Sequence, residues 1–160
     1  MPGRRLDSRS EAKGGEPAEQ MNATDSMSGE QSMDWMLEGL RQRTPGIKHV
    51  LVLSKDGLKM CFTPELGVDR ADQLAAISAG IQSLSLSASA EFGNALGAGQ
   101  SMAEFPGGLL LIVPAGEGAH LAVVASDDAD VGVVGHNMNE LVEQLGMFLT
   151  AAPRQPQHSG

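Results

Sequence analysis

Cationic and aromatic side chains are scarce in this sequence. The 160 residues contain 11 Lys and Arg against 20 Asp and Glu, a formal net charge of −9, and no Lys or Arg lies between Ala71 and Pro153. Nucleic acids and acidic lipid surfaces bind clustered cations, so the composition argues against both and favours a basic protein partner. Aromatic residues are 3% of the chain, so we expect a partner surface built from aliphatic and backbone contacts.

Patterns typical of metal sites and catalysis are also missing. The single cysteine, Cys61, excludes an internal disulfide and suits a reducing compartment. No histidine stands with Cys or a second His at a metal-ligand spacing, and neither Gly-x-Ser-x-Gly nor Gly-Lys-Ser/Thr occurs. Asp127, Asp128 and Asp130 are more simply explained as helix-capping residues than as a calcium loop. We therefore expect no enzymatic activity, no catalytic residues, no cofactor and no metal.

Long apolar runs are absent. Residues 1–31 and 153–160 hold few large apolar side chains and are expected to be disordered tails. No apolar stretch follows the arginines near the start, so a signal peptide is not expected. Gln73–Ala90 is uncharged but contains five serines, which makes it too polar to span a bilayer. The sequence predicts one domain, residues 32–152, in a cytoplasmic protein that reaches a membrane only through partners.

The order of secondary-structure signals predicts an α+β domain. Ser32 caps a short helix that ends at Thr44-Pro45-Gly46, and a last helix follows Asp130. A long helix over Ala71–Gly99 lies between two groups of strands. The predicted strands are Ile47–Ser54, Leu58–Thr63, Ser101–Phe105, Leu109–Pro114 and Ala119–Ser126. Antiparallel hairpins with helices before, between and after them predict a five-stranded antiparallel sheet in three layers, α/β/α.

Apolar side chains form one stripe on each predicted helix. The stripe of the first helix is Met33, Met36, Leu37 and Leu40, and that of the last is Val131, Val134, Met138, Leu141, Leu145 and Phe148. On the long helix the large residues recur at Leu74, Ile77, Ile81, Leu84, Ala88, Phe92 and Ala95, and we expect this stripe to face the sheet.

The opposite side of the long helix carries small residues where a solvated helix would show Lys and Glu. They are Ala76, Gly80, Ser83, Ser87 and Ala90. Small residues allow a second helix to approach closely, with apolar burial as the driving force. Two interpretations are open: the helix is covered inside one subunit, or this side is a self-association surface. We favour the second, because little other chain is available to cover it.

Several segments, in this order and at these distances, resemble one known family. They are Leu37-Glu38-Gly39-Leu40, Thr44-Pro45-Gly46, Val50-Leu51-Val52-Leu53-Ser54, Lys55-Asp56-Gly57-Leu58, Asp72-Gln73-Leu74-Ala75-Ala76-Ile77, Gly107-Gly108-Leu109-Leu110-Leu111-Ile112 and Leu121-Ala122-Val123-Val124-Ala125. Over Asp34–Ala152 the chain resembles the roadblock/dynein light chain domain. It is most similar to the short actinobacterial versions encoded beside a sensor kinase and a small Ras-like GTPase in operons called conservons.

The resemblance implies a profilin-like/roadblock fold and a homodimer. The long helices of two subunits would meet, and their third strands would pair edge to edge into a ten-stranded sheet, which also protects an open edge. The expected interface residues are Ala76, Gly80, Ser83, Ser87 and Ala90 of the helix and Ser101, Met102, Ala103, Glu104 and Phe105 of the strand.

The resemblance also implies function. Family members act without active-site chemistry as platforms or regulators of small GTPases, so we expect a regulatory or scaffold module that binds a small Ras-like GTPase in a complex with a histidine kinase. The cations of the predicted domain include Arg41, Arg43 and Arg70, which we expect to be solvated rather than to act as an arginine finger. The alternative function is a small-molecule sensor with a ligand pocket between sheet and helix.

Overall fold

The computed structural model describes residues 33–97, 99–116 and 118–151, with side-chain surroundings up to Met147. The chain divides into two compact units, Met1–Met33 and Asp34–Gly160, and the fold described below is that of the second. The two predicted tails and the predicted cap Ser32 lie outside the described residues, as does the side chain of Phe148.

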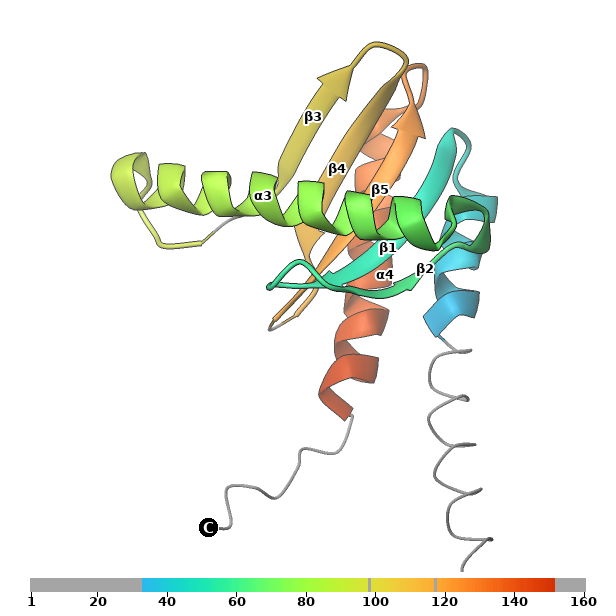
Figure 1. Ribbon diagram of the computed structural model, residues 1–160, viewed down its shortest axis with the longest axis horizontal. Coiled ribbons are helices and arrows are strands. Elements are labelled where there is room, and N and C mark those ends of the chain that lie inside the picture. Colours follow the sequence, from blue (N-terminus) through green and yellow to red (C-terminus); the bar gives the residue numbers. More distant parts are fainter. Residues whose placement is uncertain (1–32, 98, 117, 152–160) are drawn as a thin grey trace, which may run out of the picture. The chain divides into compact units, whose positions relative to one another are not determined.

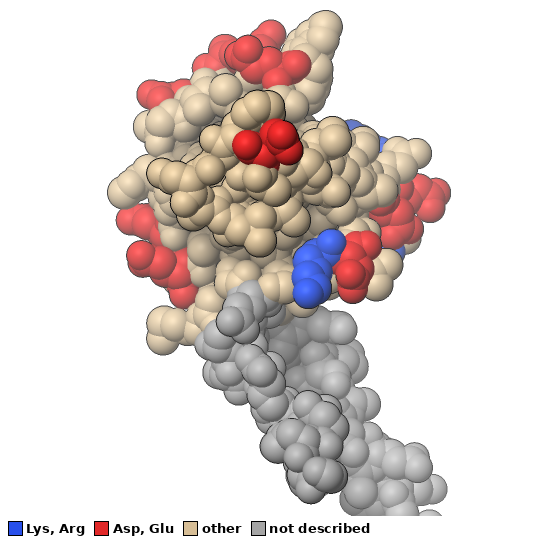
Figure 2. Space-filling view, turned by 90° about the vertical axis from the view of Figure 1, so that its left-hand side faces the viewer, with Lys and Arg blue, Asp and Glu red and all other residues tan. Residues whose placement is uncertain are grey.

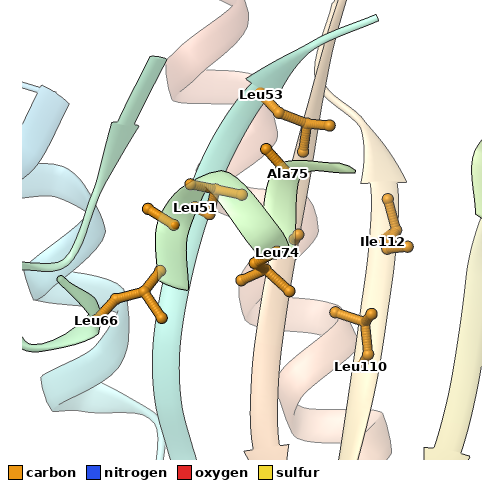
Figure 3. Packing of buried hydrophobic residues seen from close by; sticks show 9 residues of the cluster. Leu51, Leu53, Leu66, Leu74, Ala75, Leu110 and Ile112 are labelled. Atoms are coloured by element: carbon orange, nitrogen blue, oxygen red, sulfur yellow. The ribbon is translucent and has the colours of Figure 1, made fainter. Parts of the chain in front are cut away.

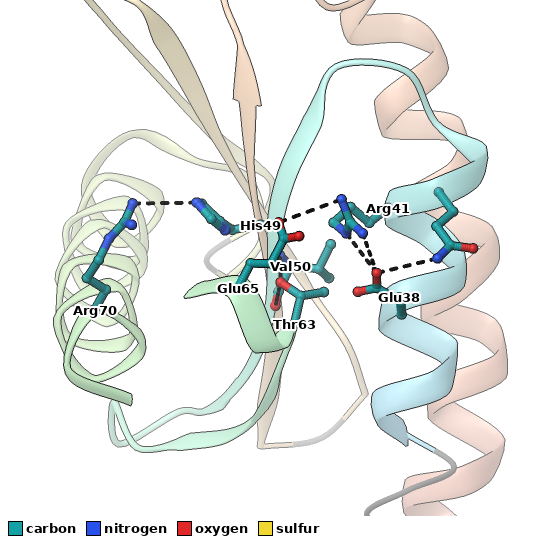
Figure 4. A network of polar contacts seen from close by, with 8 residues as sticks. Glu38, Arg41, His49, Val50, Thr63, Glu65 and Arg70 are labelled. Atoms are coloured by element: carbon teal, nitrogen blue, oxygen red, sulfur yellow. Dashed lines mark hydrogen bonds and ion pairs between the residues drawn. The ribbon is translucent and has the colours of Figure 1, made fainter. Parts of the chain in front are cut away.

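The described elements follow the predicted order. Residues 33–43 are helical, and the elements after them are β1 (Ile47–Ser54), β2 (Lys59–Phe62), the 3-10 helix η1 (Pro64–Leu66), α3 (Val68–Phe92), β3 (Ser101–Phe105), β4 (Gly108–Pro114), β5 (Ala119–Ser126) and α4 (Val131–Ala151). The strands form one antiparallel sheet in the order β2-β1-β5-β4-β3. α3 crosses one face of this sheet, and α4 and the helix at residues 33–43 lie on the other (Figures 1 and 4). The predicted three-layer α+β architecture is confirmed.

Strand prediction succeeded because each strand is bounded by turn residues. β1, β3 and β5 have the predicted bounds, and β2 and β4 differ by one residue at their ends. Gly57 has a φ of +87° in the predicted Asp56-Gly57 turn, a conformation that glycine adopts without a Cβ clash. Asp130 caps α4 as expected, since its Oδ1 accepts a hydrogen bond of 3.2 Å from the backbone N–H of Val133.

The core between α3 and the sheet combines large strand residues with small helix residues. The strands contribute Leu51, Leu53, Leu110 and Ile112, and Leu66 of η1 closes one end (Figure 3). The helix contributes mostly alanine and other modest side chains at its buried positions, which are Ala71, Leu74, Ala75, Ser78 and Gln82. Small residues on the helix let its backbone approach the sheet closely, so the bulky strand residues fill the space between them.

The opposite face of the sheet packs in the predicted way. Because side chains alternate along a strand, Val50, Val52, Leu109, Leu111 and Leu121 point away from α3. Their counterparts on α4 are Val134, Met138, Leu141 and Leu145, all fully buried, while Val131 at the helix start is exposed. From the helix at residues 33–43, Leu37 and Leu40 are buried as well.

The prediction for the long helix was wrong in two respects. The helix begins at Val68 and ends at Phe92, with Gly93 as its C-cap, rather than spanning Ala71–Gly99. Its buried face is also rotated by about a quarter turn from the expected stripe. Of that stripe, Leu74 is buried and Ile81 packs against the core, but Ile77, Leu84, Ala88 and Phe92 are exposed and Ala95 lies beyond the helix.

Candidate interaction surface

β3 leaves one edge of the sheet open. Among the described residues it pairs with β4 alone, in a register that sets Ala103 opposite Leu110 and Phe105 opposite Gly108. Two large apolar side chains of this strand are half exposed, Met102 at 53% and Phe105 at 46%. An edge with free backbone groups and apolar side chains is a template for pairing with another strand.

Phe105 is held in place by the glycine opposite it. A Cβ atom built on Gly108 would lie 2.7 Å from Cε1 of the Phe105 ring and 3.1 Å from the carbonyl oxygen of Ala125. The ring therefore covers the glycine, as aromatic residues do when they stabilise a glycine on a neighbouring strand. This packing gives the open edge a fixed apolar end.

The C-terminal part of α3 extends past β3. The helix has 25 residues and is about 37 Å long at 1.5 Å per residue, whereas the outer strands of a five-stranded sheet are about 20 Å apart. Figure 1 shows that α3 runs across the strands and continues beyond the sheet on the β3 side. Within the described helix, no residue after Gln82 is buried. We call residues 83–92 the overhang.

The overhang is almost uncharged and exposes large apolar side chains between its four serines. Leu84 is 72% exposed and Phe92 87% exposed, Leu86 is exposed too, and so is Leu96 just after the overhang. Glu91 is the one charged residue of residues 83–92. Figure 2 looks onto this side of the molecule, where most of the surface is uncharged, with one acidic group near the centre and one basic group in the lower right part of the view. Exposed apolar surface of this kind commonly marks a site of protein association.

The structure places all ten predicted interface residues at or near this surface. Ala76, Gly80, Ser83, Ser87 and Ala90 are exposed, so the described part of the chain does not cover this side of the helix. A Cβ atom on Gly80 would meet nothing within 4 Å. In β3, Met102, Glu104 and Phe105 are exposed, and Ser101 and Ala103 are partly buried. α3 and β3 are in contact through the buried side of the helix, where Gln82 meets Ser101.

Sequence reasoning missed the large residues of the surface. Ile77, Leu84 and Phe92 were assigned to the core, and Leu86 and Leu96 were not assigned at all. The signal that could have located them is length, because a helix of about 37 Å cannot be covered by a sheet about 20 Å wide.

Side-chain hydrogen bonds attach the chain after α3 to the helix. Gln82 donates from Nε2 to the carbonyl oxygen of Gly99 (3.2 Å) and accepts from the Ser101 hydroxyl (2.7 Å). Ser89 donates from Oγ to the carbonyl oxygen of Ala95 (2.5 Å) and accepts from the backbone N–H of Gly97 (3.3 Å). These bonds preorganise the surface, and sequence reasoning assigned neither residue a role.

A polar network lies on the opposite side of the domain and joins the helix layers (Figure 4). Glu38 accepts hydrogen bonds from Arg41, which also faces Glu65 of η1. The hydrogen bond from Arg41 lowers the pKa of Glu38.

The second group of contacts joins α3 to β1. Arg70 of α3 contacts Nε2 of His49 at 3.5 Å. Burial is the main cause that lowers the pKa of His49, and the charge of Arg70 lowers it further. Arg41 is thus ion-paired and partly buried rather than solvated, whereas Arg43 and Arg70 are exposed as predicted.

The strand edge near this network is closed by a side chain. The backbone N–H of Val50 donates to Oγ1 of Thr63 (3.1 Å), and the Thr63 N–H donates to the Val50 carbonyl oxygen (2.9 Å). The threonine hydroxyl thus replaces a strand carbonyl just after β2 ends and satisfies a backbone N–H of β1 that is buried.

Comparison with known proteins identifies the family. The family model described as Roadblock/LC7 domain matches residues 33–125. The crystal structure of a Roadblock/LC7 domain from Streptomyces avermitilis is 37% identical, with a TM-score of 0.71, and the match covers 74% of this chain and 98% of that one. The chain belongs to the Roadblock/LC7 domain family. The recognition made from the sequence segments is confirmed at the level of the family.

More distant structures share the Roadblock/LC7 fold. The gliding protein MglB from Thermus thermophilus is 20% identical with a TM-score of 0.68, covering 78% of this chain and 93% of that one. MglB from Myxococcus xanthus is 15% identical with a TM-score of 0.67, covering 75% and 96%. At these identities the likeness shows the fold alone. No protein with a curated description matches the chain.

Two further observations bear on the class of protein. Among the described residues, no group of three or more His, Cys, Asp or Glu side chains is arranged to hold a metal ion. None of the helices in this part of the chain is long and apolar enough to cross a membrane.

Proposed function

We propose that this Roadblock/LC7 chain forms a homodimer and that the dimer is a non-catalytic regulatory or scaffold module. It binds a small Ras-like GTPase in a bacterial signalling complex that includes a histidine kinase. The observation that supports the homodimer most directly is the overhang of α3 beside the open edge of β3. The GTPase and the kinase are supported by the family and by the resemblance to conservon proteins.

The energetic argument for the dimer starts from exposed apolar area. Burying a large aliphatic or aromatic side chain contributes about 1.5–3 kcal/mol. Leu84, Phe92 and Leu96 together could therefore offset a substantial part of the cost of association. In a twofold dimer each patch meets its own copy, so one uncharged surface supplies both sides of the contact. The small residues at Gly80, Ser83 and Ser87 let the helices cross closely while the flanking large residues are buried.

The register of the strand pair follows from Glu104. If two β3 strands pair antiparallel about a twofold axis at Ala103, Glu104 lies opposite Met102 of the other copy. An axis at Glu104 would set two carboxylates face to face, which is unfavourable for directly opposed cross-strand pairs. We therefore propose that the ten-stranded sheet is centred on Ala103.

The arrangement of cations limits how the dimer would act on a GTPase. All Lys and Arg of the described residues lie at or before Arg70, so α4, β3–β5 and the overhang offer no arginine. Stimulation of GTP hydrolysis by a donated arginine is therefore not expected from these elements. We propose that the dimer acts by positioning the catalytic residues of the GTPase itself.

The dimer is tested by solution mass. The double variant Gly80→Arg/Ser83→Arg places two cations in a close helix crossing without counter-charges, and we expect it to be a monomer. The matched control, Asn139→Arg/Gln144→Arg, adds the same charge to the exposed face of α4 and should remain a dimer. If the Gly80→Arg/Ser83→Arg variant remained a dimer, these two positions would not lie in the interface.

The GTPase partner is tested separately, by calorimetry with a small Ras-like GTPase loaded with GDP or with a GTP analogue. We expect the dimer to bind one nucleotide state more tightly and the monomeric variant to bind weakly. Absence of binding in both states would refute the GTPase assignment and leave the dimer untouched.

A further inference from the structure

A small cavity lies between α3 and the end of the sheet where β1 turns into β2. Its volume is about 260 Å³, and it is lined by Lys55, Asp56, Ala79, Gln82, Ser83, Leu86 and His120. The hairpin turn approaches the helix closely, because a Cβ atom on Gly57 would lie 3.2 Å from Cβ of Ala79. The cavity is therefore bordered by one turn, one helix and the start of β5, all within a single subunit, and it is open to solvent.

The inner wall of the cavity is polar and fixed. Gln82 is almost fully buried and uses its amide to hold Gly99 and Ser101, so its orientation is set. His120 is partly buried, and burial lowers its pKa, which keeps the imidazole neutral near pH 7. Among the described residues, the buried Nδ1 atom of His120 has no hydrogen-bond partner. The imidazole of His120 therefore has hydrogen-bonding capacity that the described residues do not use, at a residue that lines the cavity.

The rim carries one charge of each sign. Lys55 and Asp56 are exposed neighbours in the turn. Within the described part of the chain, neither makes an ion pair with another residue. Ala79 and Leu86 supply an apolar wall opposite these charges. Convergent polar groups beside an apolar wall are the usual composition of a small-molecule site.

We propose that this cavity binds a free amino acid. Its carboxylate lies toward Lys55 and the imidazole of His120, its ammonium group toward Asp56, and its side chain along Ala79 and Leu86. A zwitterion matches a rim with both charges, whereas a dianion would be repelled by Asp56 and by the net charge of −9. The volume of about 260 Å³ lies just below the range of about 300–1,000 Å³ for ligand pockets, which favours a ligand as small as an amino acid.

The cavity and the proposed dimer interface overlap at two residues of the overhang, Ser83 and Leu86, whereas every lining residue comes from one subunit. Binding is therefore measured on the wild-type chain, in the oligomeric state that this chain adopts.

The test screens the twenty free amino acids one by one against the full chain by thermal unfolding, followed by calorimetry on those that raise the Tm. We expect one or a few to raise the Tm by several degrees, since a ligand that binds only the folded state stabilises it. Acetate and succinate serve as probes for simple anion binding and should produce no comparable shift.

Two conservative variants locate the site. Lys55→Gln and Asp56→Asn remove one charge each and keep the turn, because Asn-Gly suits the same conformation as Asp-Gly. Each should weaken binding about tenfold or more through loss of a charged hydrogen bond, while the Tm without ligand stays unchanged. Lys48→Gln, an exposed change outside the cavity, should bind like the wild type.

Three results would overturn the inference: no amino acid shifts the Tm, both cavity variants bind like the wild type, or succinate binds as tightly as the best amino acid. The last result would identify an anion site instead.

Discussion

α3 and α4 cover opposite faces of the same sheet, but they use their large side chains in opposite ways. α4 buries Met138, Leu141 and Leu145 against the strands, whereas α3 buries mainly small residues and exposes Leu84 and Phe92. A helix that matches its sheet in length, volume and orientation needs no further partner. α3 is longer than its sheet is wide, and its unmatched part is the surface that we assign to association.

The largest expected difference between the two helices is in subunit stability. Leu141→Ala removes a fully buried side chain and should lower the free energy of unfolding by about 2–5 kcal/mol. Leu84→Ala, made in the monomeric Gly80→Arg/Ser83→Arg background, should change it by no more than about 0.5 kcal/mol, because Leu84 is exposed within the subunit. Urea denaturation of both proteins measures the contrast, and similar losses would mean that α3 is packed like α4.

The open edge can be tested at the glycine beneath Phe105. Gly108→Ala forces a methyl group against the ring and the Ala125 carbonyl oxygen and should cost about 1–3 kcal/mol of folding stability. The double variant Phe105→Ala/Gly108→Ala removes the ring contact and should lose less than the sum of the two single changes. Additive losses would show that the ring does not pack on Gly108.

Substitution of Gly80 is expected to have two smaller effects of opposite sign, one on the stability of the subunit and one on the affinity of the dimer. Gly80→Ala adds a methyl group in open space and should stabilise the helix by about 0.5–1 kcal/mol. If Gly80 lies at a close helix crossing, the same methyl group should weaken the dimer. Thermal unfolding of the monomeric state and the dimer dissociation constant separate the two effects, and a tighter dimer would contradict a close crossing at Gly80.

The smallest effect is expected at the Glu38–Arg41 ion pair, because both side chains are partly solvated. The pKa of Glu38 is lowered in the folded state from the usual 4.5. The contribution of the ion pair to the free energy of unfolding is therefore complete above a pH of 4.5 and is lost as the pH falls through the lower pKa of the folded state. Wild type should exceed Glu38→Gln in stability near neutral pH, and the gap should close in acid. Glu143→Gln, which removes one carboxylate from the exposed face of α4, is the control.

Much of the fold could be predicted because its signals are local. Asp56-Gly57 and Asp130 act through conformations and hydrogen bonds within a few residues, and the stripe of α4 lies on one face whatever the partner. The orientation of α3 could not be predicted in this way. A helix rich in Ala and Ser has two plausible buried faces, and the choice depends on the bulk of Leu51, Leu53 and Ile112 on the sheet.

The candidate site was predicted in part for a related reason. The small residues of α3 were identified because a solvated helix would carry charged side chains there. The strand Ser101–Phe105 was included because the resemblance to the family implies edge-to-edge pairing. The large residues of the overhang were assigned to the core, since their exposure becomes evident only when helix length is compared with sheet width. Gln82 and His120 carry no sequence signal, because their importance comes from where the folded chain places them.

The most direct test is the solution mass of the wild-type chain at micromolar concentration, measured by sedimentation equilibrium beside Gly80→Arg/Ser83→Arg. We predict twice the mass of 16.7 kDa for the wild type and a single subunit for the variant. A wild-type chain that sediments as a single subunit would contradict the assignment of the α3 overhang and the β3 edge to self-association.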